Sequence, residues 1–237
     1  VTAPNIDDLF FVSATVKHEG AEKQIRGKTL VAACGGFEAN IEWLKEHWGD
    51  AADNFLIRGT PYNRGDVLKM LLGQGVMPVG DPTQMHCVCI DARAPKFDGG
   101  IATRLDSVVF GIMVNRKAER FYDEGEDTWP KRYAIWGRLT ALQEGQIAYW
   151  IVDSKSIPLF MPSIVPAVQA GTSGELATKL NLDPAALEKT VADFNAAVRP
   201  GTFDHTVLDD CATSGLTIPK THWARKIDAP PYYGYPL

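Results

Sequence analysis

The stretch that decides the fold is Gly80–Trp136, which reads GDPTQMHCVCIDARAPKFDGGIATRLDSVVFGIMVNRKAERFYDEGEDTWPKRYAIW. It concentrates residue types that bind anions. These residues are His86, the pair Thr103-Arg104 and the basic pair Lys131-Arg132. Histidine and cationic side chains form charge-assisted hydrogen bonds with carboxylates. The stretch therefore predicts a receptor for a small molecule that carries several carboxylate groups.

Composition around this stretch is that of an ordinary folded protein. The chain has 237 residues, of which 45% are apolar and 22% are charged, so it can bury a core in one large domain or two modest ones. A net charge of −5 with interleaved basic and acidic residues argues against nucleic-acid binding. No apolar run approaches the roughly 18 residues of a membrane span, and the first residues do not resemble a signal peptide. We expect a reduced, cytoplasmic type of protein.

Four cysteines are spread through the chain at positions 34, 87, 89 and 211. Cys87 and Cys89 are two residues apart, which places both side chains on one face of a strand. A zinc or iron-sulfur site needs further ligands, and only His86 is adjacent. The pattern predicts buried free thiols, with neither a disulfide framework nor a metal.

The region before the stretch predicts strands followed by two helices. Residues 9–33 favour a strand, a turn at Glu19-Gly20 and two more strands, the last over Lys28–Cys34. Helical spacing follows over residues 38–49 and again from Gly65-Asp66 to Gly75. Prolines then bracket a change of composition, so we expect domains over residues 1–79 and 80–237.

The region from residue 80 onward predicts an α+β fold. Residues 80–145 favour strands and loops, and residues 146–152 favour a buried strand. Thr172 and Asp183 are expected to cap two short helices, and residues from Gly201 onward are expected to be loop-like. His205 lies between Asp204 and Thr206, and we interpret it as part of a solvated loop.

Two glycine-rich turns before the stretch favour a nucleotide-type cofactor. Gly35-Gly36 ends an apolar run, and TPYNRGD at residues 60–66 precedes a helix whose free N–H groups can face an anion. No G-x-G-x-x-G motif occurs, so the usual pyrophosphate-binding turn is absent from this sequence.

KTLVAACGGFEAN (28–40) and RGTPYNRGDVLKMLLGQGV (58–76) resemble FAD-domain segments of the fumarate reductase/succinate dehydrogenase flavoprotein family. FDGGIATRLD, RFYDEGEDTWPKRYAIWGRL and VRPGTFDHTVLDD are similar to the branch that includes tricarballylate dehydrogenase and the related precorrin-3B synthase flavoprotein of aerobic cobalamin synthesis. The resemblance implies a cap (catalytic) domain of the fumarate reductase type plus a remnant of an α/β FAD-binding domain. It also implies that the family's first FAD turn lies before Val1 and its last site residues after Leu237.

The resemblance assigns roles to individual residues. Cofactor-binding positions are Gly35, Gly36, Gly65 and Asp66, and substrate-binding positions are His86, Thr103 and Arg104. Arg104 stands where fumarate reductases carry a glutamate of the proton-delivery path, which suits a substrate with a third carboxylate. A gapless count places Thr128 at the family's catalytic arginine, so Arg132 is the candidate for that role, with Lys131 second.

The implied function is hydride transfer between FAD and tricarballylate, which gives an aconitate, with an iron-sulfur or haem electron-transfer partner. One alternative is the cobalamin-pathway flavoprotein, and another is an isolated cap module with no activity by itself.

Structural interpretations of the same residues stay open at this point. His86 is also typical of a core histidine, Arg104 of an ion pair with Asp98 or Asp106, and Arg132 of an ion pair with Glu124 or Glu126.

Overall fold

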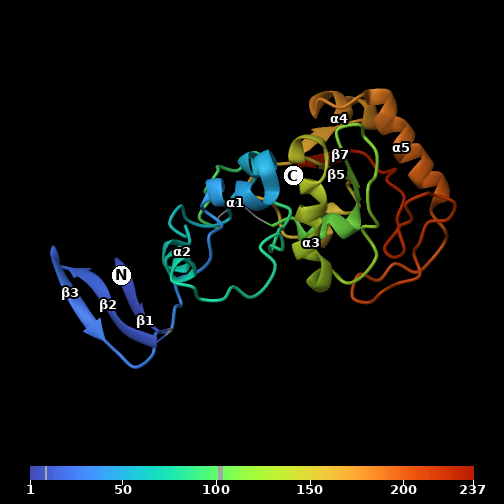
Figure 1. Ribbon diagram of the computed structural model, residues 1–237. Helices are drawn as coiled ribbons and strands as arrows, with labels where there is room; N and C mark the ends of the chain where they lie inside the picture. The colour runs from blue at the N-terminus through green and yellow to red at the C-terminus, as the bar shows by residue number, and fades with distance from the viewer. Residues whose placement is uncertain (9, 101–103) are drawn as a thin grey trace. The chain divides into compact units, whose positions relative to one another are not determined.

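The computed structural model describes residues 1–8, 10–100 and 104–237 (Figure 1). Two compact units make up the chain. One comprises Val1–Asp53 with Gly59–Gln84, and the other comprises Asn54–Arg58 with Met85–Leu237. The domain division near residue 80 stays a prediction. Within the described residues, no helix is long and apolar enough to cross a membrane.

The first unit opens with a three-stranded antiparallel sheet in the order β1-β2-β3, formed by β1 (Ala3–Asp7), β2 (Phe10–His18) and β3 (Ala21–Arg26). The predicted turn at Glu19-Gly20 joins β2 to β3, and both turn residues have positive φ. The strand predicted over Lys28–Cys34 is wrong. A strand needs a neighbour for its backbone hydrogen bonds, and no described strand pairs with this segment, in which Val31 is 81% exposed.

Both helices predicted in this unit are confirmed. α1 (Ile41–Trp48) begins where the Asn40 side chain accepts a hydrogen bond from the Trp43 N–H, and it ends at Gly49. α2 (Asp66–Gly73) follows Gly65, which has left-handed backbone geometry, and it ends before Gly75. A short 3₁₀ segment (Gly49–Asn54) follows α1.

The second unit is built on a four-stranded antiparallel sheet in the order β4-β5-β7-β6. The strands are β4 (Ile112–Val114), β5 (Tyr149–Asp153), β6 (Val168–Ala170) and β7 (Tyr232–Pro236). β5 confirms the strand predicted at residues 146–152, and all its residues are buried. β7 corrects the expectation of a loop-like C-terminal region. The short, Tyr- and Pro-rich sequence of β7 lacks the alternation of apolar and polar residues that would indicate a strand. In the structure its Tyr235 ring stacks on Trp150, with centroids 5.4 Å apart.

α4 (Ser173–Lys179) and α5 (Pro184–Ala197) lie beside this sheet (Figure 1). Both predicted caps are confirmed. The Thr172 hydroxyl accepts from the Glu175 N–H at 3.1 Å, and the Asp183 carboxylate accepts from the Ala186 N–H at 3.0 Å. The apolar faces of both helices join the buried side of the sheet in one core, to which Ile112, Ile151, Leu176, Leu187 and Phe194 belong.

The prediction of strands and loops over residues 80–145 is wrong for α3 (Trp129–Ala141). Thr128 at the N-cap and Pro130 in the first turn are the start signals that identify this helix. Its backbone comes so close to the segment before it that a Cβ atom at Gly137 would lie 2.6 Å from the Cys87 carbonyl. The short 3₁₀ helices η2 (Asp106–Phe110), η3 (Glu144–Gln146) and η4 (Ile157–Leu159) connect the larger elements.

Candidate functional site

Two predicted substrate-binding residues meet on one aromatic ring of α3. The guanidinium carbon of Arg104 lies 4.8 Å from the centroid of the Tyr133 ring. The His86 ring meets the same ring edge-on, with centroids 5.0 Å apart. Trp129 packs on the ring as well, at 5.9 Å. We call His86, Arg104, Asp106, Trp129 and Tyr133 the Tyr133 cluster.

Asp106 supplies the negative charge of the Tyr133 cluster. Its carboxylate lies 3.0 Å from an Arg104 guanidinium nitrogen, so one of the two ion pairs expected for this arginine is present. Burial raises the pKa of Asp106, and the positive charges of Arg104, Arg58 and His86 oppose that shift. Three basic side chains therefore surround a single carboxylate. The Arg104 side chain is 33% exposed, so an incoming anion can reach it.

Thr103, the third predicted substrate contact, lies outside the described residues. Its role stays a prediction.

The basic pair at the start of α3 is engaged in local ion pairs. Lys131 Nζ lies 3.0 Å from the Asp127 carboxylate, and its side chain is 67% exposed. Arg132 Nε donates to Glu126 at 2.6 Å, which is one of the two pairs expected for it. Within the described part of the chain, no contact joins either side chain to His86 or Arg104. Their catalytic role stays a prediction.

A set of buried charged side chains that the sequence did not indicate lies close to η2: Arg120, Glu124 and Lys220. Arg120 forms a two-point ion pair with Glu124, whose side chain is fully buried, and Glu124 also accepts from the Met113 N–H at 2.8 Å. Lys220 Nζ donates to the Val109 carbonyl at 2.6 Å and to the Gly111 carbonyl at 2.5 Å. These bonds hold the C-terminal end of η2 in place.

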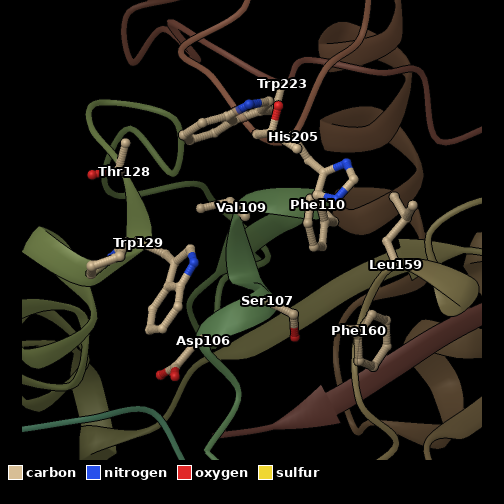
Figure 2. A pocket seen from close by; sticks show the side chains of 12 residues that line it. Asp106, Ser107, Val109, Phe110, Thr128, Trp129, Leu159, Phe160, His205 and Trp223 are labelled. Carbon is tan, nitrogen blue, oxygen red and sulfur yellow. The ribbon is translucent and has the colours of Figure 1, made fainter.

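A cavity of about 400 Å³ lies beside the Tyr133 cluster (Figure 2). Its walls come from η2, the start of α3, the end of η4 with Phe160, a loop near residue 205, and Trp223. The lining residues are Asp106, Ser107, Val109, Phe110, Thr128, Trp129, Pro130, Leu159, Phe160, His205, Thr206 and Trp223. A volume of this size with aromatic walls and a few polar groups is typical of a small-molecule site.

His205 lines this cavity, and it lies in an exposed loop, as the sequence predicts. The Trp223 indole N–H donates to the Asp204 carbonyl at 3.1 Å and to the Val207 carbonyl at 2.9 Å. The buried Asp209 carboxylate accepts from the N–H groups of Asp204 and Trp223. The loop is therefore fastened from two sides, by contacts that only the tertiary structure brings together.

All four cysteines are free thiols, but Cys34 is exposed, which corrects the expectation of burial for that residue. Burial raises the pKa of Cys87 to about 11 and that of Cys89 to about 12, which makes them poor nucleophiles and poor metal ligands. Across residues 1–8, 10–100 and 104–237, no group of three or more His, Cys, Asp or Glu side chains is placed to hold a metal ion.

The family model described as FAD binding domain matches residues 6–227, nearly the whole chain. The chain belongs to the FAD-binding domain family. FAD is the cofactor of this family, as the glycine-rich turns and the flavoprotein resemblance led us to expect.

Relatives of known name agree with this assignment. The NADH:acrylate oxidoreductase of Vibrio harveyi is 27% identical across 73% of this chain, which spans 18% of that protein. A flavocytochrome c3 fumarate reductase in its open conformation has the same fold, with a TM-score of 0.65 and 21% identity over 100% of this chain and 39% of that one. The 3-ketosteroid delta1-dehydrogenase of Sterolibacterium denitrificans also has this fold, with a TM-score of 0.71. It is 18% identical in sequence, over 99% of this chain and 46% of that one. The chain thus spans less than half the length of each of these proteins.

The Gly35-Gly36 turn fits contact with FAD. Both glycines are exposed, and Gly35 has a positive φ of 78°. A Cβ atom at Gly35 would meet only the Asn63 side chain at 3.1 Å, and one at Gly36 only the Glu38 carboxylate at 3.1 Å. The backbone is therefore bare, so a flat or phosphate-bearing ligand such as FAD can approach it closely.

Gly65 has a sufficient explanation in local packing. A Cβ atom there would lie 2.5 Å from the Trp43 ring and 2.6 Å from Phe37, and its φ is 75°. Asp66 is the first residue of α2, a position where a carboxylate interacts favourably with the helix dipole. Contacts of Gly65 and Asp66 with FAD stay predictions.

Proposed function

We propose that the full protein containing this chain is an FAD-dependent oxidoreductase that oxidises tricarballylate, a small polycarboxylate, to an aconitate. Membership of the FAD-binding domain family supports the redox class. Two of the proteins that the chain resembles are named for acrylate and fumarate, which are both unsaturated carboxylates. In this proposal residues 80–237 form the cap domain and residues 1–79 part of the FAD-binding domain.

The Tyr133 cluster is the observation that carries the substrate class. His86 and Arg104 sit on one ring, and Arg58 acts on the same carboxylate as both of them. Arg104 is a permanent cation that is 33% exposed beside His86, which supports an anionic substrate. A guanidinium binds a carboxylate through two parallel hydrogen bonds, so Arg104 can hold one carboxylate of the substrate while it contacts Asp106.

The other proposed roles also rest on attraction between basic side chains and the substrate carboxylates. His86, Thr103 and Arg104 orient the substrate carboxylates, and Arg132, with Lys131 second, lies near the proton transfer. Arg132 must then give up or share its Glu126 partner when substrate binds. Bound FAD supplies the hydride acceptor, whereas the protein supplies orientation and charge.

We also propose an iron-sulfur or haem electron-transfer partner for the full protein. Its support is the likeness to a flavocytochrome c3, whose name denotes a haem protein. Reoxidation of the substrate-reduced flavin by a co-purified haem or iron-sulfur protein in stopped-flow spectroscopy tests it. Reoxidation at the same rate without that protein would refute it.

Arg104→Glu in the full protein tests the polycarboxylate proposal. The variant replaces a carboxylate receptor by a repelling charge, so kcat/KM for tricarballylate should fall by roughly a hundredfold or more. Flavin absorbance per protein should stay unchanged, because Arg104 is not among the predicted FAD contacts. Arg199→Glu makes the same charge change at an exposed arginine bonded to Ser214 and should leave kcat/KM near wild type. Equal kinetics for Arg104→Glu and the wild type would exclude the proposed role.

A further inference from the structure

We propose that the cavity beside the Tyr133 cluster binds an uncharged, planar organic group that carries a hydrogen-bonding oxygen, such as a phenol or an aryl ketone. This inference goes beyond the proposed function, which concerns carboxylates held by Arg104 and His86. It concerns a neighbouring set of side chains, which shares Asp106 and Trp129 with the Tyr133 cluster but does not include Arg104 or His86.

The walls of the cavity favour a flat ligand. Phe110, Trp129, Phe160 and Trp223 all contribute rings to a space of about 400 Å³ (Figure 2). Aromatic faces and edges pack best against another planar π-system. Phe160 is itself supported by the Trp150 ring at 4.9 Å, so this wall holds its position without a ligand.

Three polar groups in the cavity have no partner of their own. Ser107 is 9% exposed, and its hydroxyl makes no hydrogen bond within the part of the chain that the structure describes. The Thr128 hydroxyl does not cap α3, although Thr128 is the N-cap residue. The His205 ring nitrogens are likewise without a hydrogen-bond partner among the described residues, and the ring packs edge-on against Phe110 at 6.0 Å. Ser107 is the buried one of the three, whereas Thr128 is half-buried and His205 is exposed. An unpaired buried hydroxyl between aromatic walls points to a ligand that carries oxygen or nitrogen.

The charged side chains at the cavity favour a neutral ligand over an ion. Asp106 is the only carboxylate or permanent cation among the lining residues, and it pairs with Arg104 at 3.0 Å. A cation would find this carboxylate already neutralised by Arg104 and also opposed by Arg58 and His86. An anion inside the cavity would find no lysine or arginine among the lining side chains. A neutral ligand avoids both costs.

The cavity is preformed because hydrogen bonds from other parts of the chain fix two of the segments that line it. Lys220 holds the end of η2 through the Val109 and Gly111 carbonyls. The Trp223 indole holds the loop that carries His205. A site that does not have to be ordered on binding loses less affinity to conformational entropy.

The planar, oxygen-bearing group that we propose for the cavity can belong to either of two kinds of ligand. It is either a separate small molecule or a side group of a carboxylate that Arg104 holds at the same time. Asp106 and Trp129 belong to both the cavity and the Tyr133 cluster, so one ligand can span them. Two probes separate the sources: 4-hydroxyacetophenone, which is neutral, and 4-hydroxycinnamate, which adds a carboxylate.

Isothermal titration of the 237-residue chain with both probes tests the proposal. The neutral probe should bind with a Kd on the order of a millimolar or tighter, as suits a ligand with about ten non-hydrogen atoms. Ser107→Ala should weaken it roughly five- to tenfold through loss of one hydrogen bond. Leu159→Trp fills the cavity from a half-exposed wall position and should abolish binding. Leu142→Trp makes the same change at a leucine that is 71% exposed and should bind as wild type does.

Tighter binding of 4-hydroxycinnamate, with the gain lost in Arg104→Met, supports a side group of a carboxylate ligand. Equal binding of the two probes supports a separate small molecule. Absence of binding by both probes overturns the proposal, as does unchanged binding in a Leu159→Trp variant that retains its circular dichroism and melting temperature. The titration needs neither FAD nor turnover, so its failure leaves the proposed oxidoreductase function untouched.

Discussion

Lys220→Met removes a charge from the interior of the second unit. The Lys220 side chain is 1% exposed, and its Nζ donates to the carbonyls of Val109 and Gly111. Burial lowers the pKa of Lys220 from 10.5 to about 8, while the nearby Glu124 carboxylate acts in the opposite direction. Charging this amine therefore costs more in the folded protein than in the unfolded chain.

The two pKa values define the size and the sign of the effect. The interval from about 8 to 10.5 corresponds to about 3 kcal/mol at roughly 1.4 kcal/mol per pH unit. Between these pH values the unfolded chain binds more protons than the folded protein, so the lysine's contribution to stability rises with pH. Below pH 8 the cost is constant, and above pH 10.5 it disappears.

Urea denaturation followed by tryptophan fluorescence measures this effect at pH 7.5, 8.5, 9.5 and 10.5. The free energy of unfolding of the wild type, minus that of Lys220→Met, should rise by about 3 kcal/mol over the series. Thiols and tyrosines titrate in both proteins, so their contributions cancel in the difference. Lys226→Met, at an exposed lysine, should follow the wild-type profile. Parallel profiles of the wild type and Lys220→Met would refute the reasoning.

Four further outcomes are expected. Glu124→Gln leaves the Arg120 guanidinium buried beside a neutral group, so urea denaturation should show a loss of about 3–5 kcal/mol, and a loss below 1 kcal/mol would contradict the buried ion pair. Ellman's reagent should quickly label only Cys34 in the native protein, because Cys34 is the exposed cysteine, and it should label all four cysteines in urea. Rapid labelling of a second thiol in the native protein would contradict the burial of the other three. Tyr133→Leu in the full protein should raise the KM for tricarballylate roughly tenfold, because the receptors lose their shared ring, whereas Tyr133→Phe should keep it near wild type. The 237-residue chain should bind FAD weakly, so a stoichiometric flavin spectrum that survives gel filtration would count against the proposed partial FAD domain.

Local signals predicted the elements that depend on neighbouring residues in the sequence. The caps at Thr172 and Asp183 satisfy N–H groups three residues further on, so the sequence alone contains both partners. β5 was found because a continuous apolar run is typical of a strand buried on both faces. α3 was not predicted, although Thr128 at its N-cap and Pro130 in its first turn are residue types that favour a helix start; the Thr128 side chain makes no capping hydrogen bond.

Two segments whose assignment depends on distant strands were predicted wrongly. Lys28–Cys34 has strand-like composition, but no described strand pairs with it. β7 has no apolar period, yet it lies between β5 and β6 because its register places Tyr235 opposite Trp150. Composition does not encode which strand a segment will meet.

The sequence by itself determined the family, the capped helices and two of the residues that meet at Tyr133. His86 and Arg104 were singled out by the family resemblance, and their role in substrate binding stays a prediction. Only the tertiary structure decided that Lys220 is buried, since its carbonyl partners lie 109 and 111 residues away. It also decided the cavity, because five separate segments must pack before Ser107 and His205 face one space. Burial and enclosure depend on contacts between segments far apart in the chain, which a linear pattern does not specify.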